Sequence, residues 1–437
     1  MLRRGIVAGV GALAGCSLFD GPATDEPERT ADPPDATPTT AGTVGPTPTG
    51  TGTDAPGTDA GDRESTPTDR APSTTPGAQS PTGEWRVVQA DDAHTGWKRE
   101  TVGPEPPVEV TWSVGLGGGV QRSVTVADGL AYAGSAAGSV TAVETVDGAE
   151  RWTHERRSEV RATPTVTDGT VYCGDENGDL TAVDAASGSE QWSFAAEGDR
   201  PGPTAVRSGP VVADETVYVG ATDGRVYAVD DGGSERWSFD AGGFLGVVAP
   251  VALAGGRVFA GSDAGRLYAV DAADGEEFWR YAGTGETRAW SGPTVADGVV
   301  YAGGVPGGVF AIDAVGGTER WRLETDRPVF SSPAVADGTV YVGTDGGLVL
   351  ALATEGGSER WRFETDGAVK SSPAVVDGTV VFGTTAGAVV ALDTEAGTER
   401  WRFETDGAVT GSPAVVDGTL YVGDTAGRLY ALGTSGQ

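Results

Sequence analysis

The sequence predicts an all-β protein built of eight similar repeats, and three observations support that fold class. From residue 112 onward, tryptophans recur every 40 to 45 residues, a period typical of propellers and solenoids. Within each repeat, apolar residues alternate with a period of two, which indicates strands. The 70 glycines suit a chain with many tight turns. The repeated tryptophans are Trp112, Trp152, Trp192, Trp237, Trp279, Trp321, Trp361 and Trp401.

Each repeat contains the signals of four antiparallel strands, as the sixth repeat illustrates. A short apolar strand leads through Asp337-Gly338 into a second strand, 339–343. Asp-Gly between β-branched runs predicts a hairpin, because its tight turn requires positive φ. Glycine-containing turns then lead into strands over 348–352 and 359–363. Four antiparallel strands per repeat form one blade, so we expect an eight-bladed β-propeller.

The ends of the repeat region predict how the ring closes. The chain ends after the third strand of its last repeat, and an unmatched tryptophan strand, 108–113, stands in front of the first repeat. We expect this N-terminal strand to complete the last blade, which removes an open sheet edge. A second aromatic marker runs in phase with the tryptophans: Tyr132, Tyr172, Tyr218, Phe259, Tyr301, Tyr341, Phe382 and Tyr421.

Residues 1–16 have the features of an export signal. Arg3-Arg4 form a twin-arginine pair, a short apolar run follows, and a Leu-Ala-Gly-Cys lipobox ends at Cys16. The apolar run is too short to span a bilayer as a helix. The segment resembles a lipoprotein leader, so we expect twin-arginine (Tat) export, lipidation of Cys16 and an extracytoplasmic domain anchored to the cytoplasmic membrane at the cell surface. The alternative is an ordinary secretory signal with a chance cysteine.

Two further segments precede the repeats. Residues 17–84 are rich in Thr, Pro and Asp and poor in large apolar side chains, which predicts a disordered stalk with a reach of roughly 40–50 Å. Residues 85–107 form a lead-in segment, and residues 108–437 form the propeller.

The charge balance excludes some classes of function. The chain carries 63 acidic and 30 basic residues, a net charge of −33, which disfavours nucleic acid as a partner. The acids are spread along the chain and only two lysines occur, a composition that resembles proteins of extreme halophiles. The alternative is an acidic ligand-binding surface. Beyond Cys16 the only cysteine is Cys173, so no disulfide framework is expected.

A recurring turn before the tryptophan strand carries a family resemblance. Its spacing is shown by Ala269, Asp271, Gly275 and Trp279, and it recurs in the other repeats, although the third is one residue shorter. This pattern resembles the tryptophan-docking motif of the PQQ-like (quinoprotein-type) β-propeller family over 108–437. The resemblance implies that each tryptophan packs between neighbouring blades and docks on the next one.

The resemblance leaves more than one function open. It implies, for PQQ-dependent dehydrogenases, a vicinal disulfide over the quinone and a calcium ion held by Glu and Asn. Cys173 stands alone and Asn177, the single asparagine, lies in a predicted turn, so we expect neither PQQ nor a catalytic residue. The chain also resembles the eight-bladed lipoprotein of the outer-membrane protein assembly machine. That resemblance implies a monomeric, non-catalytic scaffold for a protein or peptide partner; the alternatives are a PQQ-dependent oxidoreductase and a carbohydrate-binding sensor.

One segment has the composition of a metal site. Asp175, Asn177 and Asp179 supply alternating oxygen ligands, as in a calcium loop, but no distal Glu follows. The same positions form a hairpin turn in the other repeats, so we expect a turn with no metal.

One position varies in chemistry while the repeats around it are nearly identical. It lies three residues before the proline of the inner strand, whose start faces the central channel of a propeller. Cations and aromatic residues gathered there would form a site for an anionic or aromatic ligand. The alternative is a solvent-filled channel whose arginines pair with nearby acids. The candidate residues are Gln121, Arg161, Arg207, Trp290, Phe330, Lys370 and Thr410, with Val247 in the fourth repeat.

Overall fold

The computed structural model describes residues 84–86, 89–98, 101–198, 203–283 and 287–435. All of them belong to one compact unit, Arg70–Gln437. The predicted leader with Cys16, and the predicted stalk up to residue 83, lie outside the described residues. In the described part of the chain, no helix has the length and apolar character needed to cross a membrane.

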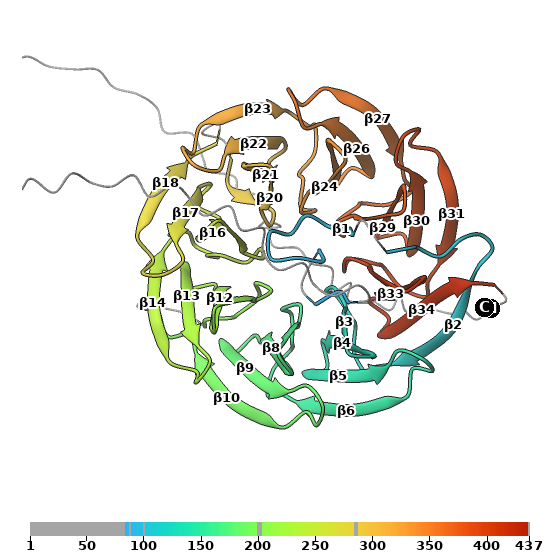
Figure 1. Cartoon of the computed structure of the whole chain (residues 1–437), viewed down its shortest axis with the longest axis horizontal. Helices are drawn as coiled ribbons and strands as arrows, with labels where there is room; N and C mark the ends of the chain where they lie inside the picture. The colour runs from blue at the N-terminus through green and yellow to red at the C-terminus, as the bar shows by residue number, and fades with distance from the viewer. Residues whose placement is uncertain (1–83, 87–88, 99–100, 199–202, 284–286, 436–437) are drawn as a thin grey trace, which may run out of the picture. The chain divides into compact units, whose positions relative to one another are not determined.

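Eight four-stranded antiparallel sheets are arranged in a ring (Figure 1). The first four blades, from inner to outer strand, are β3 (Thr125–Ala127), β4 (Leu130–Ser135), β5 (Ser139–Glu144) and β6 (Glu150–Glu155); β7 (Thr165–Thr167), β8 (Thr170–Gly174), β9 (Asp179–Asp184) and β10 (Glu190–Ala195); β11 (Val211–Ala213), β12 (Thr216–Gly220), β13 (Arg225–Asp230) and β14 (Glu235–Asp240); and β15 (Ala252–Ala254), β16 (Arg257–Gly261), β17 (Leu267–Asp271) and β18 (Glu277–Tyr281).

The other four blades follow the same order. They are β20 (Thr294–Ala296), β21 (Val299–Val305), β22 (Val309–Asp313) and β23 (Glu319–Leu323), with β19 (Ala289–Trp290) paired to β21; β24 (Ala334–Ala336), β25 (Thr339–Gly343), β26 (Leu348–Ala353) and β27 (Glu359–Glu364); β28 (Ala374–Val376), β29 (Thr379–Gly383), β30 (Ala388–Asp393) and β31 (Glu399–Glu404); and β32 (Ala414–Val416), β33 (Thr419–Gly423), β34 (Arg428–Thr434) and β2 (Val108–Gly115). A two-residue strand, β1 (Trp97–Lys98), pairs in parallel with β28.

The predicted closure of the ring is confirmed. Strand β2 pairs antiparallel with β34 and supplies the outer strand of the last blade, with Val110 opposite Leu432. Beyond the sheet, the N–H of Ser435 donates to the carbonyl of Pro107 at 2.9 Å. The ring therefore closes by strand pairing and has no open blade edge at the junction.

The hairpin turns between inner and second strands adopt the predicted conformation. Asp337 and Gly338 have φ of 44° and 71°, and the other Asp-Gly pairs behave alike. Asp214-Glu215 in the third blade also has positive φ at both residues. Two consecutive residues at positive φ match the right-handed twist of the flanking strands.

Seven of the eight repeated tryptophans show the docking arrangement implied by the resemblance, each lying against a glycine of the next blade. The indole N–H of Trp321 donates to the carbonyl of Thr354 in the next blade at 2.7 Å, and its ring lies against Gly357. A Cβ on Gly357 would approach the ring to 2.5 Å, so only glycine fits this contact. The ring also packs on Tyr301 of its own blade at 5.9 Å between centroids.

The second aromatic marker needs one correction, in the seventh blade. Val381 pairs with Ala374, the register that Tyr341 has with Ala334, so Val381 and not Phe382 occupies the marker position. Successive strand residues point to opposite faces of a sheet, which places Phe382 in a different cluster of the core from Val381. The sequence comparison aligned the aromatic ring and missed the one-residue shift.

Candidate functional site

A segment before the first blade, residues 84–86 and 89–98, lies along the inner strands of the ring, and we call it the channel segment. Figure 1 shows β1, its last two residues, at the centre of the ring. Six inner strands donate a backbone N–H to its carbonyls at 2.7–2.9 Å. The donor–acceptor pairs are Val126–Trp85, Val166–Arg86, Leu253–Asp92, Val295–Ala93, Val335–Thr95 and Val375–Gly96.

These bonds satisfy inner-edge N–H groups that otherwise face the channel. At the level of the inner strands the channel is therefore occupied by the chain itself.

Local sequence explains how the channel segment turns inside the ring. The carboxylate of Asp91 accepts hydrogen bonds from the N–H of Thr95, at 2.9 Å, and from its hydroxyl. Gly96 has φ of 67° and packs so closely that a Cβ would lie 2.8 Å from that of Ala334. The side-chain amide of Gln89 donates to two carbonyls at the start of β24. An Asx-type turn followed by glycine thus sets the fold of the segment.

The channel segment buries several titratable groups. Burial raises the pKa of Asp91, and burial together with the Asp91 charge raises that of Asp92 to about 6. Burial lowers the pKa of His94 to about 4 and also lowers that of Lys98. These shifts follow from moving charge out of water, and they keep His94 neutral near pH 7.

The predicted ring of variable residues is brought together at the mouth of the channel, mostly as neighbouring pairs. Arg207 donates to both carboxylate oxygens of Glu176, at 2.6 and 2.7 Å. Arg161 pairs with Glu159 at 2.6 Å and lies 3.6 Å from the same Glu176. The two arginines of adjacent blades are therefore linked through one carboxylate.

On the opposite arc of the mouth, Lys370 pairs with Asp345 at 3.3 Å and lies 5.7 Å from the ring centre of Phe330. Thr410 donates to the backbone carbonyl of Gln121 at 2.9 Å. Each of the three predicted cations thus has a carboxylate partner, as the alternative reading expected. An anionic ligand at the mouth would have to compete with these pairs or bridge them.

Trp290 and Val247 do not join the mouth. Trp290 is 5% exposed and packs on Phe310 with ring centres 4.9 Å apart. The Cβ of Trp290 lies against Gly261, just as the buried Val206 lies against Gly174 in the second blade. Val206 is the core residue directly before the variable residue Arg207, so Trp290 occupies the core position and not the variable position. Val247, fully buried against Gly220, does the same. Counting back from proline misplaced both, because these two repeats are one residue shorter there.

The calcium candidate is an ordinary turn closed by an ion pair. Asp175 accepts the N–H groups of Asn177 and Asp179 at 2.9 and 3.1 Å. Arg156 contacts Asp175 at 3.2 Å and Asp179 at 3.3 Å. A guanidinium therefore lies where the predicted ligands would hold a cation. Across the described residues, no three His, Cys, Asp or Glu side chains are grouped to hold a metal ion.

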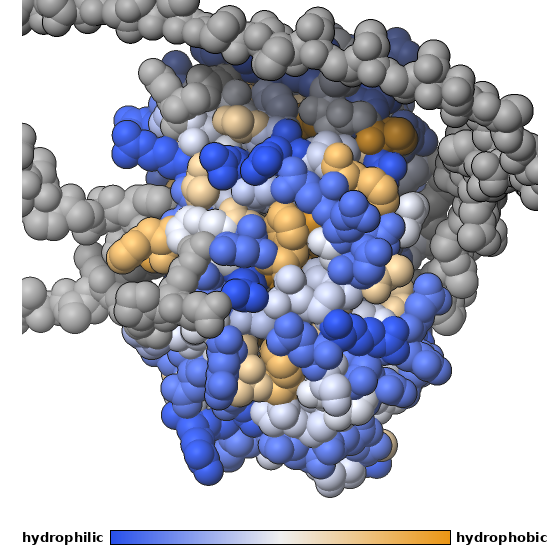
Figure 2. All heavy atoms as spheres, turned by 90° about the vertical axis from the view of Figure 1, so that its left-hand side faces the viewer, coloured by the Kyte–Doolittle hydropathy of each residue, from blue (hydrophilic) through white to orange (hydrophobic). Residues whose placement is uncertain are grey.

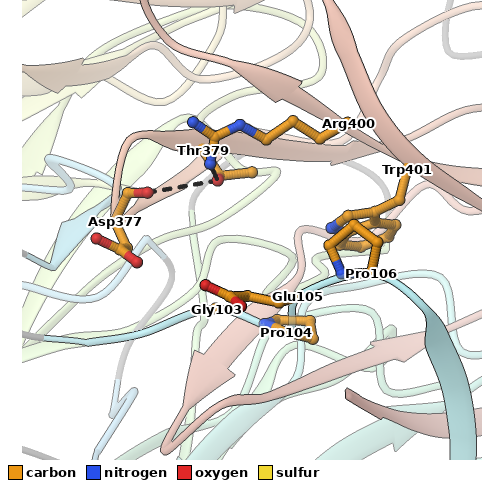
Figure 3. Close-up of a pocket in the computed structure, with 8 residues that line it drawn as sticks. All are labelled: Gly103, Pro104, Glu105, Pro106, Asp377, Thr379, Arg400 and Trp401. Carbon is orange, nitrogen blue, oxygen red and sulfur yellow. Dashed lines mark hydrogen bonds between the residues drawn. The ribbon is translucent and has the colours of Figure 1, made fainter. Parts of the chain in front are cut away.

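A small cavity marks where the lead-in leaves the channel for the rim. Gly103, Pro104, Glu105 and Pro106 line it together with Trp401, and its volume is about 40 Å³ (Figure 3). The N–H of Glu105 donates to the hydroxyl of Thr434 at 2.9 Å. Residues 103–106 thus lie beside the last repeated tryptophan, Trp401. The cavity is too small for an organic ligand and belongs to ring closure.

Eight blades, docking tryptophans on seven of them and closure by the N-terminal strand define a PQQ-like β-propeller. The chain belongs to the family described as outer membrane protein assembly factor BamB, whose model matches residues 83–243, 222–330 and 305–437. A search of curated proteins found no match.

Solved structures with the same fold include a BamB protein and proteins titled as dehydrogenases. BamB from Moraxella catarrhalis is 20% identical, with a TM-score of 0.64, covering 75% of this chain and 99% of its own. A europium-containing methanol dehydrogenase is 15% identical, with a TM-score of 0.70 and coverage of 80% and 98%. Quinohemoprotein alcohol dehydrogenase from Comamonas testosteroni is 16% identical, with a TM-score of 0.70 and 82% of each chain covered. At these identities the likeness concerns the fold alone.

The residues present do not fit the quinone cofactor that the enzyme branch implies. Cys173 is 2% exposed inside the second blade, and burial raises the pKa of its thiol to about 12. Asn177 lies in the turn described above, with its N–H bound to Asp175. No cysteine neighbours Cys173 in the sequence, so a vicinal disulfide cannot form there.

Proposed function

We propose that the protein is an extracytoplasmic, membrane-anchored lipoprotein whose propeller is a non-catalytic scaffold for a protein or peptide partner. The observation that supports this proposal is the occupied channel, which leaves the two faces of the disc as the surfaces where a partner fits. Membership of a family described as an assembly factor agrees with a scaffold role. A lipid on Cys16 would keep the scaffold at the membrane.

The face that carries the channel mouth is the proposed contact surface. The described chain begins on the other face, where Trp85 bridges to Val126 and Arg86 lies near the turn carboxylates of Asp128 and Asp168. The alternating charges of the mouth suit a partner with complementary charges, because such patterns give specificity.

Proximity labelling at the cell surface tests the scaffold. A triple variant, Arg161→Ser, Arg207→Ser and Lys370→Ser, should lose the labelled partner at matched salt. A control with Arg280→Ser, Arg320→Ser and Arg362→Ser removes the same charge from the outer strands and should keep it. Unchanged labelling by the mouth variant would refute the proposed contact surface.

The anchor has its own test. Cys16→Ser should release the protein into the medium, whereas Cys173→Ser, a buried position, should leave it in the membrane fraction. Retention of the Cys16→Ser protein in membranes would refute the lipid anchor.

A quinone-dependent oxidoreductase is the second candidate, favoured by the likeness to two dehydrogenases at TM-scores of 0.70. Titration of the purified protein with PQQ and calcium, followed by absorption spectroscopy, separates the two functions. A bound quinone spectrum with dye-linked alcohol oxidation would replace the scaffold proposal with the enzyme.

A further inference from the structure

A groove of about 630 Å³ lies between the third and fourth blades, on the face with the hairpin turns. Its volume is within the range of small-molecule sites, about 300–1,000 Å³. The lining includes Arg236 and Asp214 from one blade, and Arg257, Asp271 and Phe278 from the next. Figure 2, which views the side of the disc that carries β14 and β18, shows apolar side chains in small separate groups on a hydrophilic surface.

The departures of blades three and four from the repeat pattern meet in this groove. Arg257 starts the second strand, where the other blades have Leu130, Thr170, Thr216, Val299, Thr339, Thr379 and Thr419. Phe278 precedes the docking tryptophan, where five blades have Arg151, Arg236, Arg320, Arg360 and Arg400. In the fourth blade the arginine therefore starts the second strand and an uncharged residue precedes the tryptophan. Five other blades have the reverse arrangement. The turns beside them, Asp214-Glu215 and Gly255-Gly256, also depart from Asp-Gly.

At its position in the fourth blade, Arg257 contacts an aromatic ring and two carbonyls. Its guanidinium lies 4.3 Å from the ring centre of Phe278, and Nη1 donates to the carbonyls of Ala314 and Val315 at 2.7 and 3.0 Å. These contacts fix the guanidinium plane and leave Nε and Nη2 of Arg257 for a ligand. The ring of Phe278 remains 48% exposed. A cation held on an aromatic ring is pre-organised for recognition.

Neither arginine of the groove has a carboxylate partner among the described residues. By contrast, Arg320 and Arg400, which occupy the position of Arg236 in their blades, pair with Asp313 and Asp393 at 2.7 Å. The only bond of Arg236 is a 3.5 Å contact to the carbonyl of Glu215. Two guanidiniums without a carboxylate partner among the described residues therefore line the same groove.

We propose that this groove binds a hexuronate, a sugar ring that carries a carboxylate, as one residue of an acidic glycan. The carboxylate accepts charge-assisted hydrogen bonds from Arg236 and Arg257. The apolar face of the sugar packs on the exposed part of Phe278, and its hydroxyls donate to the carboxylates of Asp214 and Asp271. A bare carboxylate would make no use of the exposed part of Phe278 or of the two acids that line the groove. The site is separate from the channel mouth, so the inference does not rest on the scaffold proposal.

Isothermal titration calorimetry on the purified chain, at one fixed salt concentration, tests the site. Tri-galacturonate should bind, and neutral galactotriose and acetate should bind at least tenfold more weakly. Equal binding of galactotriose would overturn the role of the carboxylate, and equal binding of acetate would overturn the role of the sugar. Absence of tri-galacturonate binding would overturn the site.

The repeats supply a variant that should fold. Arg257→Thr with Phe278→Arg restores the residues of the sibling blades, and it should weaken tri-galacturonate binding at least tenfold while keeping the thermal melting curve. Arg320→Gln, which changes an arginine paired with Asp313 in the next blade, should leave binding unchanged. Full binding by the restored variant, or equal loss by Arg320→Gln, would overturn the assignment to this groove.

Discussion

At the scale of single residues, the tightest constraint is the contact between each docking tryptophan and a glycine of the next blade. Seven such glycines have positive φ, and an added Cβ would meet an indole ring at 2.5 to 3.0 Å. The glycine thus serves two needs, a left-handed backbone and close approach. Blade-to-blade register depends on this pair, because the indole N–H also bonds the same turn.

Adjacent glycines allow the two needs to be separated. Gly356 and Gly357 have φ of 74° and 67°, but a Cβ at 356 would meet nothing within 4 Å whereas one at 357 would lie 2.5 Å from Trp321. Both alanine variants carry the backbone cost, and Gly357→Ala adds overpacking worth about 1–3 kcal/mol. Denaturant unfolding should show Gly357→Ala the less stable by that amount. Equal stability of the two variants would mean that the indole can move aside.

The buried His94 predicts a pH dependence with a definite sign. Its pKa is about 4 in the folded protein and 6.5 as the ordinary value, so its contribution is full above pH 6.5 and is lost as pH falls toward 4. Asp92 acts oppositely: its pKa rises from 3.8 to about 6, so stability is gained as pH falls from 6 to 3.8. In the wild-type protein the two changes largely offset each other.

In the His94→Gln variant, the pH-dependent contribution of Asp92 to the unfolding free energy should no longer be offset by that of His94. Between about pH 7 and about pH 4.5, the unfolding free energy of this variant should rise relative to wild type by about 2–3 kcal/mol. Urea titrations at the two pH values measure the difference, and Asp92→Asn should change it in the opposite direction. Parallel pH profiles for wild type and His94→Gln would contradict a neutral, buried histidine.

At the scale of elements, sequence predicted the blades well and the channel segment poorly. Strands and Asp-Gly turns follow from local pattern, since β25 and its hairpin depend on residues within a few positions. The channel segment bonds to six inner strands spread from Val126 to Val375, and no local pattern encodes such contacts. At the mouth, the cations were predicted, but their acid partners Glu176 and Asp345 come from the turns between second and third strands. The groove had a detectable signal, the exchanged Arg257 and Phe278, in a comparison of repeats at the turn face.

Truncation tests the channel segment as an element. Removal of residues 1–83 should leave thermal unfolding unchanged, whereas removal of residues 1–98 should lower the unfolding free energy by several kcal/mol. Six lost backbone hydrogen bonds at about 0.5–1.5 kcal/mol each, with exposure of the buried Trp85, set that scale. Differential scanning calorimetry on both proteins measures it. If the two truncated proteins have the same melting temperature, the channel segment fills the channel without stabilising the ring.

At the scale of the whole molecule, ring closure and surface charge act against each other. The lead-in segment and propeller together, residues 85–437, carry 51 acidic and 25 basic residues, a net charge of −26. Self-repulsion of like charge destabilises a compact state, and mobile ions screen it over about 10 Å at 0.1 M and less at higher salt. The outer-strand ion pairs are mostly exposed, so they offset little of this repulsion.

The protein should therefore become more stable as salt increases. The melting temperature is expected to rise between about 0.2 M and about 3 M KCl, most steeply at the low end, where the screening length changes fastest. A parallel series in sucrose at matched osmolality separates charge screening from exclusion of solute, since sucrose strengthens burial without screening. Equal rises in KCl and sucrose would show that charge is not the cause, and a flat KCl series would refute the interpretation of the acidity as adaptation to salt. A rise in KCl alone would assign the acids to solvent adaptation.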